Sequence, residues 1–279
     1  MKVEFYSFWD GFNKDTLYFE DLFNDYKDIY DTLQVWSVFG PEPKSINTNP
    51  RILSVQLSGE AYYKDVNKYK INFISKNQEF NVIPMLFAAY EIRINNNLHK
   101  LTEERIEHQI PKTRFCNFIA SNNQPTERKH FFLELSKHKF VDSCGGVFRN
   151  WTGPPAPPFS SKEYHDFLHK WRFMICFENR KVDYYLTEKI VNAYMGGCIP
   201  IYWGCPQIIE KNIFNKKAIL LLEDNTPESV TKLINRIMEL ENSPELYSQM
   251  HKEPLFINNE IAKEFTIEYM KEQIKLKLA

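Results

Sequence analysis

Two apolar runs joined by a polar loop and a helical stretch occupy residues 172–204, and this segment constrains the possible folds more than any other part of the chain. Residues 172–178 are dense in aromatic and apolar side chains, which is typical of a buried strand. Residues 190–194 offer an apolar face at helical spacing, and residues 198–203 have the pattern of a second buried strand. A strand–helix–strand unit of this length predicts a crossover between parallel strands, and therefore an α/β fold.

The start of the predicted helix carries the chemistry of this unit. Thr187 is a suitable N-cap residue, Glu188 and Lys189 follow it in the first turn, and Gly196 and Gly197 supply a C-terminal stop. The free N–H groups of a helix N-terminus attract anions, and Lys189 adds a full positive charge. The pattern predicts a phosphate or pyrophosphate site at the carboxyl ends of the strands. The alternative is that Glu188 and Lys189 are ordinary solvated residues of a first turn.

This segment resembles the donor-binding motif of the α1,3-fucosyltransferases. Phe177-Glu178-Asn179 is followed by Thr187-Glu188-Lys189, then by the helix and by a strand of the form Gly-x-Ile-Pro-Ile-x-x-Gly at residues 197–204. The resemblance implies an α/β fold of the GT-B architecture, in which two Rossmann-like domains face each other across a cleft. It also implies that GDP-fucose is the donor substrate.

Strand-like and helical stretches alternate along the chain, which is consistent with two such domains. We expect residues 1–108 to form an acceptor-binding Rossmann-like domain, and residues 109–279 to form a GDP-fucose-binding Rossmann-like domain with a C-terminal helix. The polar stretch 92–110 is the expected connection, and the tail 258–278 is predicted to be one amphipathic helix that packs back across the first domain. Further strands are expected at 2–9, 33–39, 52–57, 71–75, 82–90, 115–120, 139–144 and 218–222, and further helices at 17–30, 126–136, 161–170 and 228–241.

A second motif follows the strand predicted at residues 115–120. The sequence Phe-Ile-Ala-Ser-Asn, five further residues and then Arg128 resembles the second donor-site motif of the family, in which the arginine contacts the pyrophosphate. The planar guanidinium fork suits that contact. Arg114 is a weaker rival for this role, and without the resemblance Arg128 would be interpreted as a surface residue.

Three more residues match family positions that line the donor site: Asn179, Tyr185 and Glu188. The resemblance implies that Glu188 accepts hydrogen bonds from ribose or fucose hydroxyls and that Tyr185 contacts the sugar or a phosphate. Glu178 lies in the same stretch, and a structural role is the alternative to a donor-binding role for this residue. Relatives often have Asp-Tyr where this chain has Tyr184-Tyr185, and Asp183 lies one residue too early for that aspartate.

Glu60 is the candidate general base. It follows the strand predicted at residues 52–57, within the sequence Leu-Ser-Gly-Glu. The family carries an essential glutamate in a similar context in its acceptor domain, and a carboxylate facing the cleft can deprotonate an acceptor hydroxyl. The resemblance implies a single displacement that inverts a β-linked donor into an α-linked product. The alternative is an ordinary loop glutamate beside a glycine.

Fixed cations are expected to neutralise the departing pyrophosphate, because the sequence contains no Asp-x-Asp pair to bind a divalent metal. We therefore expect no metal and no cofactor beyond the donor. His165 and His169 stand at the i and i+4 spacing of zinc ligands, but aspartate replaces the glutamate of the zinc-protease motif. A core or surface pair of histidines is the favoured interpretation.

Composition excludes some partners. The net charge is −1, so no nucleic-acid surface is expected. No apolar run approaches the roughly 20 residues of a membrane helix, and the first residues form a strand pattern rather than a signal peptide, which favours a cytoplasmic location. The five cysteines are odd in number and lack a Cys-x-x-Cys pair, which favours buried thiols in a reducing compartment.

The sequence therefore predicts a fucosyltransferase that forms an α1,3 link to an N-acetylglucosamine-containing glycan or glycoprotein. Two alternatives stay open. One is a GT-B glycosyltransferase that uses another nucleotide sugar, and the other is a non-catalytic relative that binds a sugar nucleotide. The set Glu60, Arg128 and Lys189 argues against the second alternative.

Overall fold

The computed structural model describes residues 1–10, 12, 19–45, 47–84, 86, 88, 99–105, 111–159 and 161–279. The chain divides into two compact units. The first comprises Met1–Tyr90, Val182–Leu186 and Lys263–Ala279, and the second comprises Glu91–Lys181 and Thr187–Ala262. The boundary expected between residues 108 and 109 lies outside the described residues.

The first unit contains a parallel sheet whose strands follow their sequence order, β1-β2-β3-β4-β5. Burial along β3 and β4 is nearly continuous, as in parallel sheets that are covered on both faces. Because all the strands are parallel, the loops that follow β1, β2 and β3 leave from one edge of the sheet. The strands are β1 (Lys2–Tyr6), β2 (Thr32–Ser37), β3 (Ile52–Leu57), β4 (Ile71–Ile74) and β5 (Val82–Pro84).

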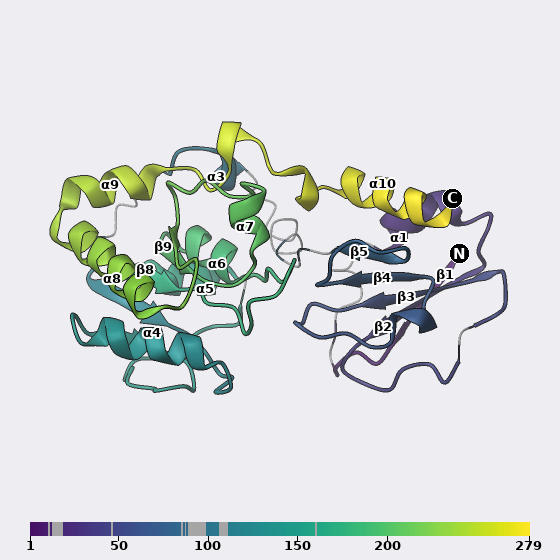
Figure 1. Cartoon of the computed structure of the whole chain (residues 1–279), viewed down its shortest axis with the longest axis horizontal. Helices are drawn as coiled ribbons and strands as arrows, with labels where there is room; N and C mark the ends of the chain where they lie inside the picture. The colour runs from purple at the N-terminus through teal and green to yellow at the C-terminus, as the bar shows by residue number, and fades with distance from the viewer. Residues whose placement is uncertain are drawn as a thin grey trace. The chain divides into compact units, whose positions relative to one another are not determined.

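Helices from both ends of the chain pack in the first unit. Phe19 and Phe23 of α1 (Phe19–Phe23) share one core with Met270 and Ile274 of α10 (Ile267–Leu278). Figure 1 shows α10, in yellow, beside α1. Short 3-10 turns lie at η2 (Asn24–Tyr26) and η3 (Val66–Lys68).

The prediction of one tail helix over residues 258–278 is wrong. The tail forms two 3-10 turns, η4 (Ile257–Asn259) and η5 (Lys263–Phe265), before α10 begins. Asn258 has a left-handed backbone with φ of 60°, which ends a helix. The Thr266 side chain then accepts a hydrogen bond from the Tyr269 N–H and starts α10.

The second unit contains a parallel sheet with the order β10-β9-β8-β6-β7. The chain runs outward from β6 to β7 on one side, then returns to β8 and continues to β9 and β10 on the other side. The strand order therefore reverses between β6 and β8, as in doubly wound α/β folds. The strands are β6 (Arg114–Phe118), β7 (Val141–Ser143), β8 (Trp171–Ile175), β9 (Ile199–Tyr202) and β10 (Leu220–Leu221).

Helices α4 and α8 add apolar side chains to the core around this sheet. Phe131, Phe132 and Leu135 of α4 are buried, as their spacing predicts, and α8 buries five apolar residues. The predicted helix 126–136 is confirmed at both ends, whereas α9 was not anticipated from the sequence. The helices are α3 (His99–Thr102), α4 (Thr126–Ser136), α5 (Lys162–Leu168), α6 (Lys189–Met195), α7 (Gln207–Glu210), α8 (Pro227–Asn242) and α9 (Pro244–Lys252). None of the helices that the structure describes combines the length and hydropathy of a membrane span.

Candidate active site

The predicted crossover is confirmed, since β8 and β9 pair in parallel and α6 lies between them in the chain. In doubly wound sheets, ligands bind outside the carboxyl ends of the strands at the point where the strand order reverses. Here that point lies between β6 and β8. Arg128 follows β6 along the chain, and Asn179 follows β8. The topology therefore brings the two donor-site motifs to one edge of the second sheet.

The buried Glu178 side chain connects several residues at this edge of the sheet. Its carboxylate is fully buried and accepts hydrogen bonds from the Thr187 N–H at 2.8 Å, the Thr187 hydroxyl at 2.8 Å and the Lys189 ammonium at 3.1 Å. Burial raises the pKa of Glu178, while the Lys189 charge acts in the opposite direction. Glu178 thus ties the end of β8 to the start of α6. An acidic residue at the end of an apolar strand is the sequence signal for such a buried hub.

A glycine makes room for this carboxylate. Gly204 has φ of +154°, and a Cβ at this position would lie 2.5 Å from Glu178 Cγ and 2.8 Å from the Tyr202 hydroxyl. The Tyr202 hydroxyl lies 3.4 Å from Glu178 Oε1 and accepts a hydrogen bond from the Cys205 N–H at 3.1 Å. The last glycine of the family-like strand is therefore required by close packing, and not only by backbone freedom.

The prediction that Thr187 caps the helix is wrong. Helix α6 begins at Lys189, and its N-cap position is Glu188, which makes no side-chain capping bond. The Thr187 hydroxyl is used elsewhere, because it donates to Glu178 and accepts from Lys189 Nζ at 2.7 Å. The predicted stop is confirmed, with Gly196 at the C-cap and Gly197 at φ of 75°.

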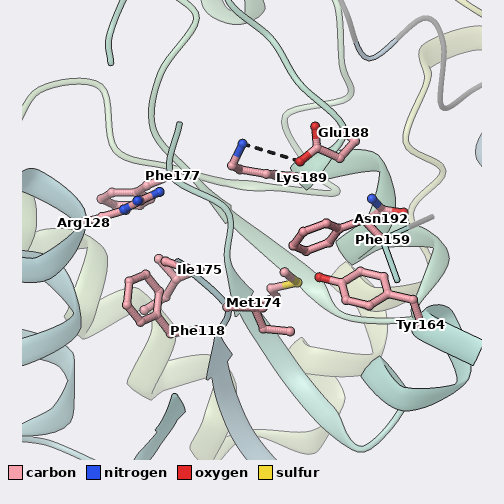
Figure 2. Close-up of a pocket in the computed structure, with 12 residues that line it drawn as sticks. Phe118, Arg128, Phe159, Tyr164, Met174, Ile175, Phe177, Glu188, Lys189 and Asn192 are labelled. Atoms are coloured by element: carbon pink, nitrogen blue, oxygen red, sulfur yellow. Dashed lines mark ion pairs between the residues drawn. The ribbon is translucent and has the colours of Figure 1, made fainter. Parts of the chain in front are cut away.

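Lys189 links the buried carboxylate to the surface of the site. Its ammonium lies 3.1 Å from Glu178 and 3.6 Å from Glu188, and 22% of its side chain is exposed. Figure 2 shows the Glu188 and Lys189 side chains close together at the rim of a cavity, with Arg128 on the opposite side. Two fixed cations therefore line one cavity.

Arg128 crosses the point where the strand order reverses. Its guanidinium is buried, donates to Asn179 Oδ1 at 3.0 Å and donates also to the Asn122 carbonyl. The rival Arg114 starts β6 and so lies at the other end of that strand, where it pairs with Asp142 at 2.8 Å and stacks on Trp151. The structure joins Arg128, and not Arg114, to the first donor motif.

The cavity has a volume of about 30 Å³, which corresponds to about one water molecule. Its floor is apolar and includes Phe118, Met174 and Ile175. Drug-sized ligands need pockets of roughly 300 Å³ or more, so this cavity is too small to enclose one.

The remaining predicted site residues belong to the first unit. Glu60 is half-buried, and its N–H donates to the hydroxyl of the buried Ser58 at 3.1 Å. That hydroxyl donates to the Tyr62 carbonyl at 2.6 Å, which fixes the turn that carries Glu60 after β3. Tyr185 is buried and lies in the segment Val182–Leu186. Ser58 is a positioning residue that the sequence did not identify, whereas the structural role expected for Glu178 agrees with its buried contacts.

The histidine pair has no metal-site geometry. His165 is buried, and its Nε2 lies 2.8 Å from Asn192 Oδ1, while burial lowers its pKa. Among the described residues, no group of three or more histidine, cysteine or acidic side chains could hold a metal ion. All five cysteines are buried, and no two of them form a disulfide bond.

Comparison with known proteins gives the family of the chain. Glycosyltransferase family 10 (fucosyltransferase), C-terminal region, matches residues 110–264, which is more than half of the chain. The α(1,3)-fucosyltransferase FucT of Helicobacter pylori is 36% identical over 113 residues, which cover 40% of this chain and 22% of that protein. The GDP-fucose protein O-fucosyltransferase 3 of Gallus gallus is 30% identical over 129 residues, which cover 45% of this chain and 27% of that protein. The chain thus spans less than a third of the length of these two relatives.

The fold is also similar to a solved structure. The crystal structure of α1,3-fucosyltransferase with GDP-fucose aligns with a TM-score of 0.70 and 20% sequence identity, over 99% of this chain and 90% of that one. Together with the two parallel sheets, this likeness confirms the predicted GT-B fold class. The chain belongs to glycosyltransferase family 10, the fucosyltransferases.

Proposed function

We propose that the protein transfers L-fucose from GDP-fucose to a hydroxyl of an N-acetylglucosamine-containing glycan, with inversion, and forms an α1,3 link. Family membership supports the donor and the reaction class. The observation that carries the proposal is the position of Arg128 and Lys189, which come from either side of the reversal in strand order and line one cavity.

In this proposal the two cations hold the pyrophosphate of the donor. As the bond between the fucose anomeric carbon and the phosphate oxygen breaks, negative charge grows on the leaving GDP, and fixed cations stabilise it. Arg128 is preorganised by its bonds to Asn179 and the Asn122 carbonyl. Lys189 is held in place by Thr187 and Glu178. Because fixed cations supply this charge, the proposal requires no divalent metal.

The acceptor oxygen forms the new bond to the anomeric carbon as the phosphate bond breaks, and its proton passes to Glu60. Glu188 accepts hydrogen bonds from hydroxyls of the ribose or fucose, and Tyr185 contacts the sugar or a phosphate. Asn179 acts by holding Arg128. The five cysteines form no disulfide bond, which favours a reducing compartment, and we place the enzyme in the cytoplasm in this proposal.

A second acceptor class has its own support. The likeness to a protein O-fucosyltransferase makes a serine or threonine hydroxyl of a polypeptide the alternative acceptor. In this proposal the first unit, which supplies Glu60, binds the acceptor and so selects between the two acceptor classes. The proposal favours the glycan because the highest identity reported above is to an α(1,3)-fucosyltransferase.

The test is transfer from GDP-fucose to N-acetyllactosamine, to an N-glycan core and to an unmodified peptide, in buffer with EDTA, followed by mass spectrometry. The expected result is the gain of one deoxyhexose on a glycan, with an α-anomeric signal and an α1,3 link in the NMR spectrum of the product. Transfer to the peptide alone would replace the glycan acceptor with a polypeptide. Transfer only from another nucleotide sugar, or GDP-fucose binding without any transfer, would contradict the proposal.

Glu60→Gln supplies the matched variant. It keeps the size of the side chain and removes the base, so kcat is expected to fall about 10²- to 10⁴-fold while GDP binding is retained. Full activity of Glu60→Gln would mean that another group takes the proton.

A further inference from the structure

Two aromatic side chains stand exposed at the carboxyl edge of the first sheet. Trp9 follows β1 and is 52% exposed, and Phe39 follows β2 and is 51% exposed. The turn that carries Glu60 follows β3. Because β1, β2 and β3 are parallel neighbours, all three loops leave the sheet from the same edge.

The two rings are held in a defined arrangement. Their centroids lie 5.4 Å apart with an angle of 86° between the planes, so the edge of one ring packs against the face of the other, and about half of each residue stays exposed. Phe12 packs against Trp9 at 4.8 Å, and stacks on Phe8 at 4.2 Å. An exposed tryptophan supported on its buried side by other rings has lost much of its rotamer freedom before any ligand binds.

The loops that carry these rings are fastened to each other. Ser7 has φ of 62°, and its hydroxyl donates to the Pro41 carbonyl at 2.6 Å. Gly40 packs so closely on this residue that a Cβ would lie 2.9 Å from Ser7 Cβ. The aromatic pair is therefore a built surface, and not two independent mobile side chains.

The chemistry of this surface fits a sugar ring. A pyranose presents C–H bonds on its faces and hydroxyl groups around its edge. The negative face of an aromatic ring attracts such C–H groups, and the exposed Asp10, which follows Trp9 directly in the chain, offers a carboxylate to hydroxyl groups. A protein partner would need a larger contiguous apolar patch than two rings supply.

We propose that Trp9 and Phe39 form a stacking subsite for a sugar ring of the acceptor, next to the ring whose hydroxyl reacts at Glu60. Neighbouring strands lie about 4.8 Å apart, so the β1 and β3 loops start about 10 Å from each other. That separation places the stacked ring beside the reacting ring rather than on it. The inference deepens the proposed function and rests on it for the role of Glu60.

The experiment compares Trp9→Ala and Phe39→Ala with Phe80→Ala. Phe80 is 93% exposed and lies two residues before β5, at the opposite edge of the same sheet, so it is the matched control. Binding of N-acetyllactosamine and of N-acetylglucosamine is followed by saturation-transfer NMR, and transfer from GDP-fucose is measured with the same two acceptors. Trp9→Phe tests whether an aromatic face alone restores binding.

The expected result is a loss of about tenfold in affinity and in kcat/KM for the disaccharide in the Trp9 and Phe39 alanine variants. Little change is expected with the monosaccharide, with the KM for GDP-fucose or with Phe80→Ala, and Trp9→Phe is expected to recover most of the loss. Equal disaccharide binding by all variants, or a wild-type protein that binds neither saccharide, would overturn the subsite. A wild-type protein that binds the disaccharide but transfers nothing from GDP-fucose would contradict the proposed function without contradicting the sugar-binding role of Trp9 and Phe39.

Discussion

Lys189 joins the buried and exposed parts of the candidate site. Its ammonium contacts the buried Glu178 carboxylate and the Thr187 hydroxyl, yet 22% of the side chain remains exposed at the rim. A fixed ammonium of this kind can exchange contact with a surface carboxylate for contact with a phosphate. The residue is thereby positioned for an anionic ligand before that ligand arrives.

Lys189→Ala is expected to weaken GDP binding about 10- to 100-fold, because a hydrogen bond to a charged group is worth about 1.5–3 kcal/mol. Isothermal calorimetry measures the affinity. Lys181→Ala is the control, since Lys181 lies in the loop that precedes α6, is exposed and donates to the Glu223 carbonyl. Chemical denaturation checks that the variant is folded, because Glu178 loses its cation. Unchanged GDP affinity in folded Lys189→Ala would remove this residue from the pyrophosphate site.

Gly204 is constrained as tightly as any charged residue of the site. Gly204→Ala would place a Cβ 2.5 Å from Glu178 Cγ at a backbone φ of +154°. Overpacking and backbone strain together are expected to lower the free energy of unfolding by about 2–4 kcal/mol. Urea denaturation measures this loss. In Gly146→Ala the nearest neighbour of the added Cβ would be Ser121 Cα at 3.8 Å, an ordinary contact distance, and a similar loss there would refute the packing argument.

Among the helices and strands, α9 is a short helix that sequence patterns did not predict. Pro244 directly after Ser243 looks like an interruption, yet proline fits the first turn, and the Ser243 side chain accepts a hydrogen bond from the Leu246 N–H at 3.4 Å. The helix brings His251 onto the Gly197 carbonyl at 2.9 Å, at the C-terminal end of α6. Helix α9 thus closes the end of α6 that lies away from the candidate site.

The burial of His251 predicts how the free energy of unfolding depends on pH. Burial, helped by the charges of Arg105 and Lys112, lowers the pKa of His251 from 6.5 to about 3. Between these values the unfolded chain binds more protons than the folded one, so stability is present above the unfolded pKa and is lost as the pH falls. From pH 7.5 to pH 5 the loss from this one group is about 2 kcal/mol. Urea denaturation of wild type and His251→Gln at the two pH values should show the smaller pH dependence in the variant, and equal slopes would contradict the assignment.

At the scale of the whole molecule, the end of the chain completes the unit in which the chain begins. Met270 and Ile274 of α10 enter the core formed by α1 and the strands β2 to β5. Residues separated by the entire second unit are therefore part of one hydrophobic core. The first unit cannot complete that core until residues 267–278 have been synthesised.

Ile274→Ala is expected to lower the free energy of unfolding of the first unit by about 2–5 kcal/mol, since the side chain is fully buried. Leu276→Ala, in the same helix but 63% exposed, is expected to change stability by less than about 0.5 kcal/mol. Limited proteolysis should show earlier cleavage within residues 1–90 in the first variant. Equal protection of the two variants would mean that α10 is not part of the core.

Local patterns determined a good part of the fold. The strand at Ile52–Leu57 and the helix at Thr126–Ser136 are confirmed at both ends, because β-branched runs and helical spacing act over a few neighbouring residues. The spacing of Phe177–Asn179 and Thr187–Lys189 was enough to indicate the family. Thr187 failed as a cap because a buried carboxylate competed for its hydroxyl, and that competitor lies nine residues away in the sequence.

Sequence patterns alone were therefore enough for the α/β class, the crossover at residues 172–204 and the family. Tertiary contacts were needed to show that Arg128 rather than Arg114 meets Asn179, that the buried Glu178 carboxylate contacts Lys189, and that the tail packs with the first strands. The physical reason is that periodicity and capping act along the chain, whereas strand order and burial bring together residues that the sequence keeps far apart.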